Sequence, residues 1–481
     1  MCVGMNQIHH CEKLLEAELI NSDVALRKLP EIADVINYKK TVKLLADNEK
    51  LKTKKREWHE LDRIDFNPNS QKDLQLLFHE VLDYPVLDKT EGGAPGTGAK
   101  TIKKHLADLK QESHRVLFES LISIAECSII LNNFIKNFKE AELGTDGNYW
   151  LFGSFNLGGT VSGRLSSSNP NMQNIPSSGT RWAKPIKECF IAPDGWIFCG
   201  ADFASLEDRI SALTTRDPMK LKVYTDGYDG HCLRAYYYFP EAYEGIPETP
   251  DAINATKDTH EKWRQRSKTP TFALTYGGTY MAIIEQAGLP KAEALRIERN
   301  YHELYSVSNE WVQSHIERAT SDGYVTCAFG LRVRTPLLKR TVLNARVTPY
   351  QAKKEARTAG NALGQSWGLL NNRAAIEVQQ KTLRSAFAMH IKPGAHIHDA
   401  QYFYVKDDKR TLKYLNDVLG QAMAWQGLPI IQHDVVKLSG ELDLFYPSWA
   451  HKKTLPNNIS INEITQLCDE HFESLEAKGI V

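Results

Sequence analysis

The stretch AHIHDAQYFYV, from Ala395 to Val405, poses the question that decides the fold. After the aspartate, the run of aromatic and β-branched residues is typical of a strand on a pleated, half-buried surface. Asp399 stands at its head, next to apolar and aromatic neighbours. A half-buried carboxylate is strongly unfavourable unless a cation or a metal compensates its charge. The sequence therefore predicts a strand with a compensated carboxylate at its start.

A second stretch, GWIFCGADFASLEDRISAL (195–213), repeats this pattern. An apolar run predicts a buried strand that ends at Asp202, and helical spacing follows in Leu206, Ile210 and Leu213. Carboxylates on neighbouring strands could hold Mg²⁺, which prefers oxygen ligands. Two such ions ~3.5–4 Å apart can clamp the oxygens of a phosphoryl transfer. Taken alone, each aspartate is better explained as a capping or turn residue.

Composition sets wide limits on the class of protein. The chain has 481 residues, which allows two to four domains, and is 42% hydrophobic and 25% charged. Lys and Arg balance Asp and Glu at 59 each, which neither predicts nor excludes a nucleic-acid partner. We expect no membrane span and no secretory signal. The eight cysteines form no CxxC pair, so we expect reduced thiols of a cytosolic protein.

A third pattern places Arg264, Lys268, Phe272 and Tyr276 four residues apart. On a helix this spacing forms one stripe. Two cations followed by two aromatic rings suit a ligand with a polyphosphate at one end and a base at the other. The alternative is an amphipathic helix with a solvated basic end and an aromatic core contact.

The N-terminal part reads as mostly helical. Helical spacing extends over residues 38–64, and Ser70 is expected to cap the next helix after the turn DFNPNS. Residues 89–106 form a Gly-rich loop that leads into the start of a Lys-bearing helix. The loop lacks the GxxxxGK[ST] spacing of a phosphate-binding P-loop and is read as a flexible surface loop.

Together these motifs resemble the polymerase region of the DNA polymerase I family, the family A DNA polymerases. FNPNSQKDLQLLF and PVLDKTEGGAPGTGAKTI resemble the thumb, and SGRLSSSNPNMQNIP resembles the family's TGRLSS…PNLQNIP. DFASLEDR is similar to motif A (DYSQIELR), RQRSKTPTFALTYGG to motif B (RxxxKxxxFxxxYG) and HIHDAQ to motif C (VHDE). FYPSWAH is similar to the closing segment. The motifs follow the family's order over most of the chain.

The resemblance implies an α+β, right-hand polymerase fold with an antiparallel palm sheet, helical fingers and a helical thumb. The implied parts are a lead segment 1–39, a thumb 40–150, a palm 151–212 and 321–451, fingers 213–320, and a C-terminal extension 452–481. No 3′–5′ exonuclease domain fits ahead of the thumb-like helices, so we expect a phage-like, stand-alone polymerase piece or a fragment, without proofreading.

The resemblance also implies the roles of site residues. Asp202 and Asp399 match the metal-binding aspartates, with the backbone carbonyl of Phe203 as a further ligand of two Mg²⁺ ions, for which Mn²⁺ can substitute. The matched dNTP-binding residues are Arg264, Lys268 (also catalytic), Phe272, Tyr276, His231 and the ribose gate Glu207. The matched DNA-binding residues are Arg164, Asn171, Gln173, Asn174, Asn361, Gln365 and His398.

Three departures from the family pattern stand out. Motif C has Ala400 where the family has Glu, so a third carboxylate is missing and the effect on metal affinity or turnover is open. Pro270 lies inside motif B, where the helix either kinks or begins; the kept spacing favours a kink. The Arg expected after NIP is absent, and Arg181 is the candidate substitute.

The implied function is template-directed addition of dNTPs to a primer 3′-OH in DNA replication or repair, in the cytoplasm of a bacterial or phage-infected cell. Its implied partners are primer–template DNA, dNTPs and, as a candidate, a separate exonuclease or replisome chain. Two other classes stay open: a single-subunit RNA polymerase, against which Glu207 argues, and a degenerate polymerase kept as a DNA-binding subunit, which only Ala400 favours.

Overall fold

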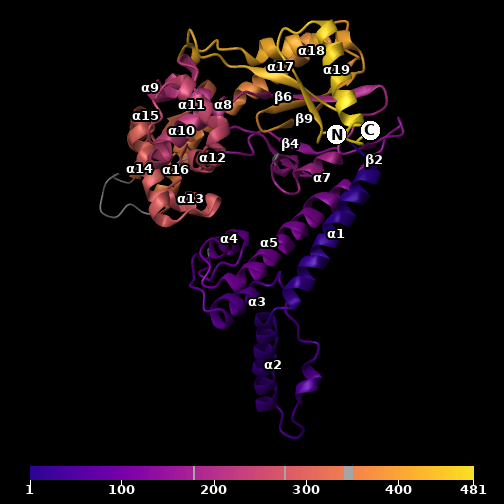
Figure 1. Cartoon of the computed structure of the whole chain (residues 1–481), viewed down its shortest axis with the longest axis vertical. Helices are drawn as coiled ribbons and strands as arrows, with labels where there is room; N and C mark the ends of the chain where they lie inside the picture. Colours follow the sequence, from indigo (N-terminus) through magenta and orange to yellow (C-terminus); the bar gives the residue numbers. More distant parts are fainter. Residues whose placement is uncertain (91, 177–178, 276–277, 341–349) are drawn as a thin grey trace. The chain divides into compact units, whose positions relative to one another are not determined.

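The computed structural model describes residues 1–90, 92–176, 179–275, 278–340 and 350–481. The chain divides into two compact units, whose elements are labelled in Figure 1. The first unit contains Met1–Ile8, Phe138–Ala282 and Ala292–Val481, and the second contains His9–Asn137 and Ile283–Lys291.

A five-stranded antiparallel sheet forms the centre of the first unit. Its strand order is β12 (Lys452–Leu455), β11 (Gly440–Phe445), β6 (Trp196–Phe203), β10 (Ala400–Lys406) and β9 (Ile391–Ile397). The strands predicted around the two aspartates are β6 and β10, and they pair with each other. Their apolar and aromatic residues suit a central position, because both faces of the middle strands are largely covered.

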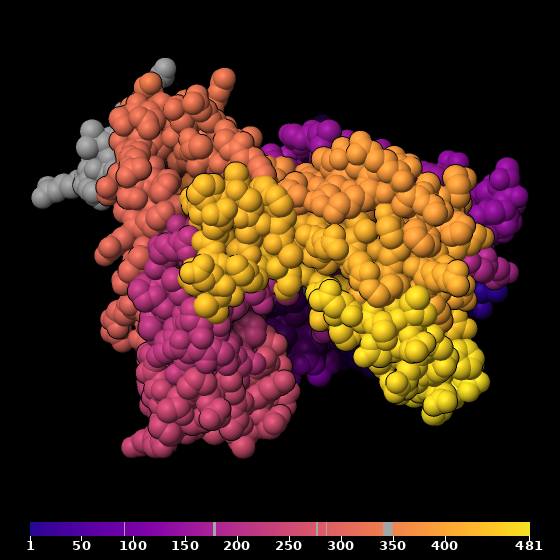
Figure 2. All heavy atoms as spheres, turned by 90° about the horizontal axis from the view of Figure 1, so that it is seen from above, coloured from indigo at the N-terminus to yellow at the C-terminus, as the bar shows by residue number. Residues whose placement is uncertain are grey.

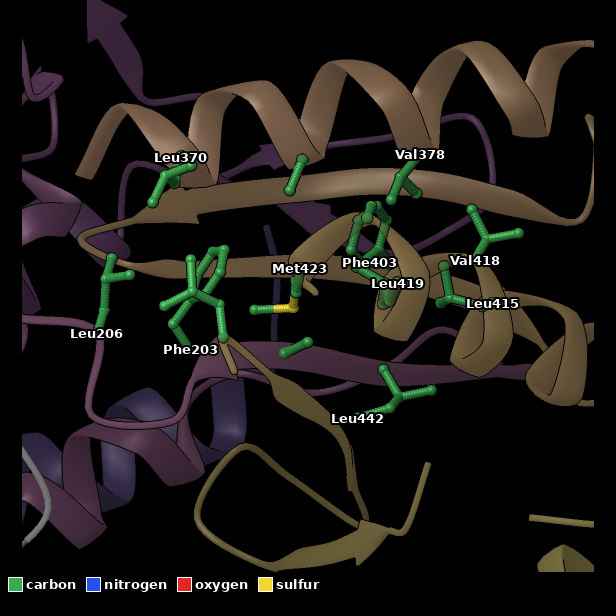
Figure 3. Close-up of a cluster of buried hydrophobic side chains, with 14 of the residues drawn as sticks. Phe203, Leu206, Leu370, Val378, Phe403, Leu415, Val418, Leu419, Met423 and Leu442 are labelled. Carbon is green, nitrogen blue, oxygen red and sulfur yellow. The ribbon is translucent and has the colours of Figure 1, made fainter. Parts of the chain in front are cut away.

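One face of this sheet is buried beneath helices α17 (Leu369–Leu383) and α18 (Lys409–Met423). Every second residue of β6 points into this core, namely Cys199, Ala201 and Phe203. Figure 3 shows the shared core, whose labelled members include Leu370, Val378, Phe403, Leu415, Leu419 and Leu442. Because side chains alternate along a strand, Asp202 lies on the opposite face, away from this core.

Helices make up most of the remainder of the first unit. They are α7 (Ala183–Glu188), α8 (Leu206–Thr215), α9 (Pro218–Thr225), α10 (Gly230–Tyr238), α11 (Pro250–Thr259), α12 (Glu261–Thr275), α14 (Lys291–Leu304), α15 (Ser306–Asp322), α16 (Tyr350–Gln365) and α19 (Ile461–Glu476). In Figure 2 the surface is hollowed between the magenta and pink residues of the first unit, from about 213 to 275, and the yellow C-terminal residues.

Short strands complete the first unit. A small sheet has the order β1 (Cys2–Val3), β3 (Tyr149–Trp150), β2 (Glu142–Leu143). Two further pairs are β4 (Ser154–Asn156) with β5 (Ser166–Ser168), and β7 (Tyr324–Thr326) with β8 (Arg332–Arg334).

Helix α12 continues through Pro270. The helix therefore does not begin at that proline, and Arg264, Lys268 and Phe272 lie on one helix, as their spacing predicts. Tyr276, the fourth member of the predicted stripe, lies outside the described residues.

The second unit is helical. Its elements are α1 (Met5–Arg27, which begins in the first unit), α2 (Pro30–Lys50), α3 (Gln71–Gln75), α4 (Ala99–Ala107), α5 (Arg115–Ile130) and α6 (Lys136–Phe138, which ends in the first unit). Helix α13 (Tyr280–Ala287) contains the boundary between the two units, because Ala282 is assigned to the first unit and Ile283 to the second. The Ser70 hydroxyl accepts a hydrogen bond from the Asp73 N–H, which confirms the predicted cap of α3. The helix predicted over residues 38–64 is wrong beyond Lys50, because the Lys-rich stretch that follows has no buried face.

One helical run, Glu112–Phe138, has the length and composition of a membrane span, contrary to the expectation from sequence. Its buried residues include Leu117, Phe118 and Leu121, which belong to the hydrophobic core of the second unit. Core helices meet the same length and composition test, so packing accounts for the apolar character of this run.

Candidate active site

The two predicted carboxylates, Asp202 and Asp399, meet at one end of the sheet. Asp202 pairs in register with Ala400, the residue directly after Asp399. Partial burial and, second, the neighbouring Asp399 carboxylate raise the pKa of Asp202 to about 6. Asp202 is nevertheless an exposed residue, so water screens part of this repulsion. The fold thus places two like charges together, an arrangement that favours a bound cation.

Asp399 lies in a two-residue turn between β9 and β10. The residues that flank the turn, Ile397 and Ala400, pair with each other. The first turn residue, His398, has a backbone φ of 53°, in the left-handed region that non-glycine residues seldom adopt. The direction of the Asp399 side chain therefore depends on a conformation that surrounding groups must hold.

Arg164 forms ion pairs with two carboxylates of the site. Its Nη2 atom donates to Glu207 Oε1 and lies 3.4 Å from Asp399 Oδ1. Burial raises the pKa of Glu207, and the Arg164 charge opposes that rise. Gly368 makes room for this cluster, because a Cβ atom there would lie 3.0 Å from Arg164 Nε and 3.4 Å from Asp399 Oδ1.

Side-chain amides surround the turn that carries Asp399. Gln173 Nε2 donates to the carbonyl of His396, and Gln173 Oε1 accepts from the His398 N–H. Asn371 Nδ2 donates to the carbonyl of His398, and Gln401 Nε2 donates to Asn371 Oδ1. Gln173 was predicted to read the DNA minor groove. Both the nitrogen and the oxygen of its side-chain amide are instead engaged within the protein.

Helix α12 presents the predicted cations beside α10. Arg264 donates to both carboxylate oxygens of Asp229: Nε lies 3.3 Å from Oδ1, and Nη2 lies 2.8 Å from Oδ2. Burial, then the charges of Arg234 and Lys268, lower the pKa of His231 to about 4, so its ring is neutral at pH 7. The Phe272 ring is 52% exposed and lies 6.4 Å from the His231 ring. Arg264, Lys268, Phe272 and His231 are therefore neighbours.

A buried ion pair joins α8, which contains the second half of motif A, to α10. Arg234 Nη2 donates to Asp208 Oδ1, and Arg234 Nε donates to the Tyr305 hydroxyl at 2.9 Å. Burial disfavours the charge of Asp208, but Arg234 and the Tyr224 hydroxyl outweigh it and lower its pKa to about 2. Asp208 follows Glu207, and Arg234 lies one helical turn after His231, so this pair links two predicted site residues.

The remaining predicted residues lie apart from these contacts. The Asn171 side chain caps the short 3₁₀ helix Met172–Asn174, and the Phe203 side chain is buried in the sheet core. Asn361 and Gln365 lie one turn apart on α16, and Arg181 lies over the Trp182 ring. Their predicted contacts to DNA or metal stay predictions.

Sequence reasoning missed the partners of the site residues: Asp208, Asp229, Arg234, Asn371 and Gln401. Gln401 carried a usable signal, because this amide, the last residue of the motif C stretch HIHDAQ, begins an otherwise apolar and aromatic run. Asn371 carried none, because a polar residue in an amphipathic helix is ordinarily solvated.

The donor set fits a magnesium ion that is completed by its substrate. Among the described residues, no group of three or more His, Cys, Asp or Glu side chains could hold a metal. Mg²⁺ is usually bound through one or two carboxylates plus substrate phosphates and water, and not by a full protein cage. The pair of Asp202 and Asp399, with mutual repulsion that a cation would relieve, meets this requirement.

Comparison with known proteins gives a consistent family. A family model described as DNA polymerase family A matches residues 39–438. The thermostable DNA polymerase I of Thermus aquaticus is 27% identical over 281 residues, which are 58% of this chain and 31% of that protein. DNA polymerase I of Pseudomonas aeruginosa is 27% identical over 288 residues, 60% of this chain and 29% of its own length. The matches thus span about a third of the length of these relatives.

The fold agrees with a solved structure. The polymerase domain of Pol1 from M. smegmatis, in complex with DNA primer-template and dNTP, superposes with a TM-score of 0.69 at 18% identity. The superposition covers 94% of this chain and 67% of that chain. The predicted α+β polymerase fold and the predicted family resemblance are both confirmed. The chain belongs to DNA polymerase family A.

Proposed function

We propose that this chain is a DNA-directed DNA polymerase that adds dNTPs to the 3′-OH of a primer under the direction of a template. The observation that carries the proposal is the meeting of Asp202 and Asp399 at the end of the sheet, in the same compact unit as the cationic helix α12. The named relatives, which are DNA polymerases I, support the same reaction.

Asp202 and Asp399 would hold Mg²⁺, with the backbone carbonyl of Phe203 as a further oxygen ligand. Bound there as a pair of ions, Mg²⁺ would stabilise the charge of the transferring phosphate and activate the attacking hydroxyl, and Mn²⁺ could take its place. The two carboxylates contribute by holding fixed negative charge where the phosphate arrives. Ala400, which pairs with Asp202 in the β6–β10 register, contributes no carboxylate there.

The triphosphate would bind along α12 and the start of α10. Arg264 offers a planar guanidinium for bidentate contact, and Lys268 offers a point charge one turn further on. Arg264 already donates to Asp229, so the triphosphate has to share or replace that partner. His231, neutral at pH 7, can donate a ring N–H to a phosphate without adding positive charge.

The sugar would lie between Glu207 and Phe272. The Glu207 carboxylate would exclude a ribose 2′-OH, and the exposed Phe272 ring would face the 3′ side of the sugar. The family resemblance implies residues for primer–template DNA. Apart from Gln173, whose side-chain amide is engaged within the protein, they would be Arg164, Asn171, Asn174, Asn361, Gln365 and His398. Contacts to minor-groove acceptors common to all base pairs would sense pair geometry without reading sequence.

A primer-extension assay with Mg²⁺ tests the proposal. The wild-type chain should extend a primed template with dNTPs, whereas Asp202→Asn and Asp399→Asn should abolish extension and leave DNA binding nearly unchanged. Asp407→Asn is the matched control, because Asp407 is an exposed aspartate beyond the other end of β10. The proposal would be rejected if the wild-type chain extended the primer no better than Asp202→Asn and Asp399→Asn.

The same assay separates the other classes. Preference for rNTPs would identify an RNA polymerase, and DNA binding without extension would identify a non-catalytic subunit. Proofreading is tested with a mismatched primer incubated without dNTPs: we predict that it stays full length, and trimming by the purified chain would contradict this. The phage-like character, the cytoplasmic location and a separate exonuclease or replisome partner remain predictions.

A further inference from the structure

The turn that carries Asp399 needs to be held in place. Two residues join β9 to β10, and His398 adopts a φ of 53° that a histidine seldom occupies. Such conformations cost of order 1–3 kcal/mol and persist where the surroundings over-determine them. Asp399 follows directly, so any rotation about the His398 backbone would redirect its carboxylate.

Two side-chain amides take up both backbone polar groups of His398. Its N–H donates to Gln173 Oε1 at 2.9 Å, and its carbonyl accepts from Asn371 Nδ2 at 3.2 Å. The two amides come from different elements, since Gln173 lies in the 3₁₀ helix Met172–Asn174 and Asn371 lies on α17. His398 is thus held from two sides.

The remaining bonds of both amides also go to this hairpin. Gln173 Nε2 donates to the carbonyl of His396 at 3.0 Å, and Asn371 Nδ2 lies 2.7 Å from His396 Nε2. Asn371 Oδ1 accepts from Gln401 Nε2 at 2.9 Å, and Gln401 is on the following strand. A buried amide is unfavourable unless it is hydrogen-bonded, and Asn371 is fully buried. Among the residues that the structure describes, the side chain of Asn371 bonds only to His396, His398 and Gln401.

We infer that Asn371 and Gln173 are positioning residues that clamp the His398 peptide groups and thereby fix the Asp399 carboxylate for metal binding. This inference rests on the proposed polymerase function, since it assigns Asp399 to the metal. It also gives Gln173 a role inside the protein in place of the predicted minor-groove contact. Residues that orient a metal ligand through hydrogen bonds typically change metal affinity or activity by about 10–100-fold when removed.

The test compares the full chain with Asn371→Ala, Gln173→Leu and the control Asn372→Ala. Asn372 is a neighbour on the same helix that, among the described residues, makes no hydrogen bond to the hairpin. Mn²⁺ binding in the absence of DNA and dNTP is followed by electron paramagnetic resonance. Hydrogen exchange of the peptide that contains His398 reports the clamp itself. Mg²⁺ titration of primer extension reports its effect on turnover.

We expect about 10–100-fold weaker Mn²⁺ binding in Asn371→Ala and Gln173→Leu, a matching shift of the Mg²⁺ requirement, and faster exchange of the His398 N–H in Gln173→Leu. The KM for dNTP should change less than the kcat. Gln173→Glu keeps the acceptor for the His398 N–H, so it should restore the protection against exchange. Asn372→Ala should behave like the wild type.

Folded variants with wild-type Mn²⁺ binding and wild-type exchange would overturn the inference. If Asn371→Ala does not fold, Gln173→Leu decides the question alone. Gln173 lies in a different element from the buried Asn371, and it bonds the His398 N–H directly. A wild-type chain that does not extend a primer would reject the proposed function, and the exchange measurement would still judge the clamp.

Discussion

The Nη2 atom of Arg164 is shared between Glu207, to which it donates, and Asp399, from which it lies 3.4 Å away. A single guanidinium therefore neutralises the predicted ribose gate and approaches a predicted metal ligand. This relationship makes the gate an electrostatic element as well as a steric one.

Glu207→Ala should raise the use of rNTPs, because the carboxylate that would lie under C2′ is removed. It should also lower kcat with dNTPs several-fold, because the freed Arg164 then competes with the metal for Asp399. Glu207→Gln keeps the bulk but loses the charge, so it should lower kcat while keeping most of the selectivity. The ratio of dNTP to rNTP incorporation checks this; an unchanged ratio in Glu207→Ala would place the gate elsewhere.

Asp202 predicts a pH dependence of the metal-free protein. Its folded-state pKa of about 6 is raised above the usual value of 3.8, so its contribution to the free energy of unfolding is present below pH ~4 and is lost as the pH rises through about 6. Asp202→Asn should therefore raise the melting temperature in EDTA at pH 8, with little effect at pH 4. A lower melting temperature at pH 8 would contradict the repulsion, and Asp407→Asn serves as the control.

The buried pair of Asp208 and Arg234 predicts a large effect on stability. Arg234→Met would leave the Asp208 carboxylate without its cation, which typically costs ~3–5 kcal/mol. Because the folded-state pKa of Asp208 is about 2, its contribution to stability is present above pH ~4 and is lost as the pH falls through about 2. Urea unfolding of Arg234→Met, Asp208→Leu and the double variant checks the pair. We expect the double variant to be more stable than Arg234→Met alone, and equal or lower stability would argue against the pairing.

The contact between Arg264 and Asp229 predicts opposite effects on dNTP binding. Arg264→Ala should raise the KM for dNTP by about 10–100-fold, since hydrogen bonds to charged groups contribute ~1.5–3 kcal/mol. Asp229→Asn removes a negative charge beside the triphosphate, yet Asn can still cap α10 through its side-chain oxygen, so the KM should fall. Steady-state kinetics check both, and a raised KM in Asp229→Asn would mean that Asp229 positions Arg264.

The sequence predicts the elements of the site better than their partners. Apolar runs that end at Asp202 and begin after Asp399 are local signals, and the two strands form as predicted. The spacing of Arg264, Lys268 and Phe272 likewise survives Pro270. In contrast, Arg164 pairs with Glu207 and Asn371 with His398, which are far apart in the chain. The spacing of apolar residues along the sequence predicts helices and strands but not contacts between such distant side chains. The helix predicted over residues 38–64 ends at Lys50 for a related reason: local spacing suggested a helix, but residues 51–60 are exposed and have no core to pack against.

Phe272 gives the sharpest test of motif B. Its ring is 52% exposed on the helix that carries Lys268, and its neighbour is the neutral His231. If the ring faces the C3′ side of the sugar, it offers no polar group in place of a missing 3′-OH, so the enzyme should discriminate against dideoxynucleotides.

Phe272→Tyr adds a hydroxyl to this half-exposed ring, which the proposed binding mode places near the triphosphate. A restored polar partner typically contributes ~1–3 kcal/mol, so the use of dideoxynucleotides should rise by roughly one to two orders of magnitude relative to dNTPs. The matched control is Tyr280→Phe on α13, which removes a hydroxyl outside α12 and should leave the ratio unchanged. The measurement is the ratio of dideoxy to deoxy incorporation in all three proteins. An unchanged ratio in Phe272→Tyr would mean that this face of α12 does not meet the sugar, because the hydroxyl can act only if Phe272 and Lys268 contact the same nucleotide.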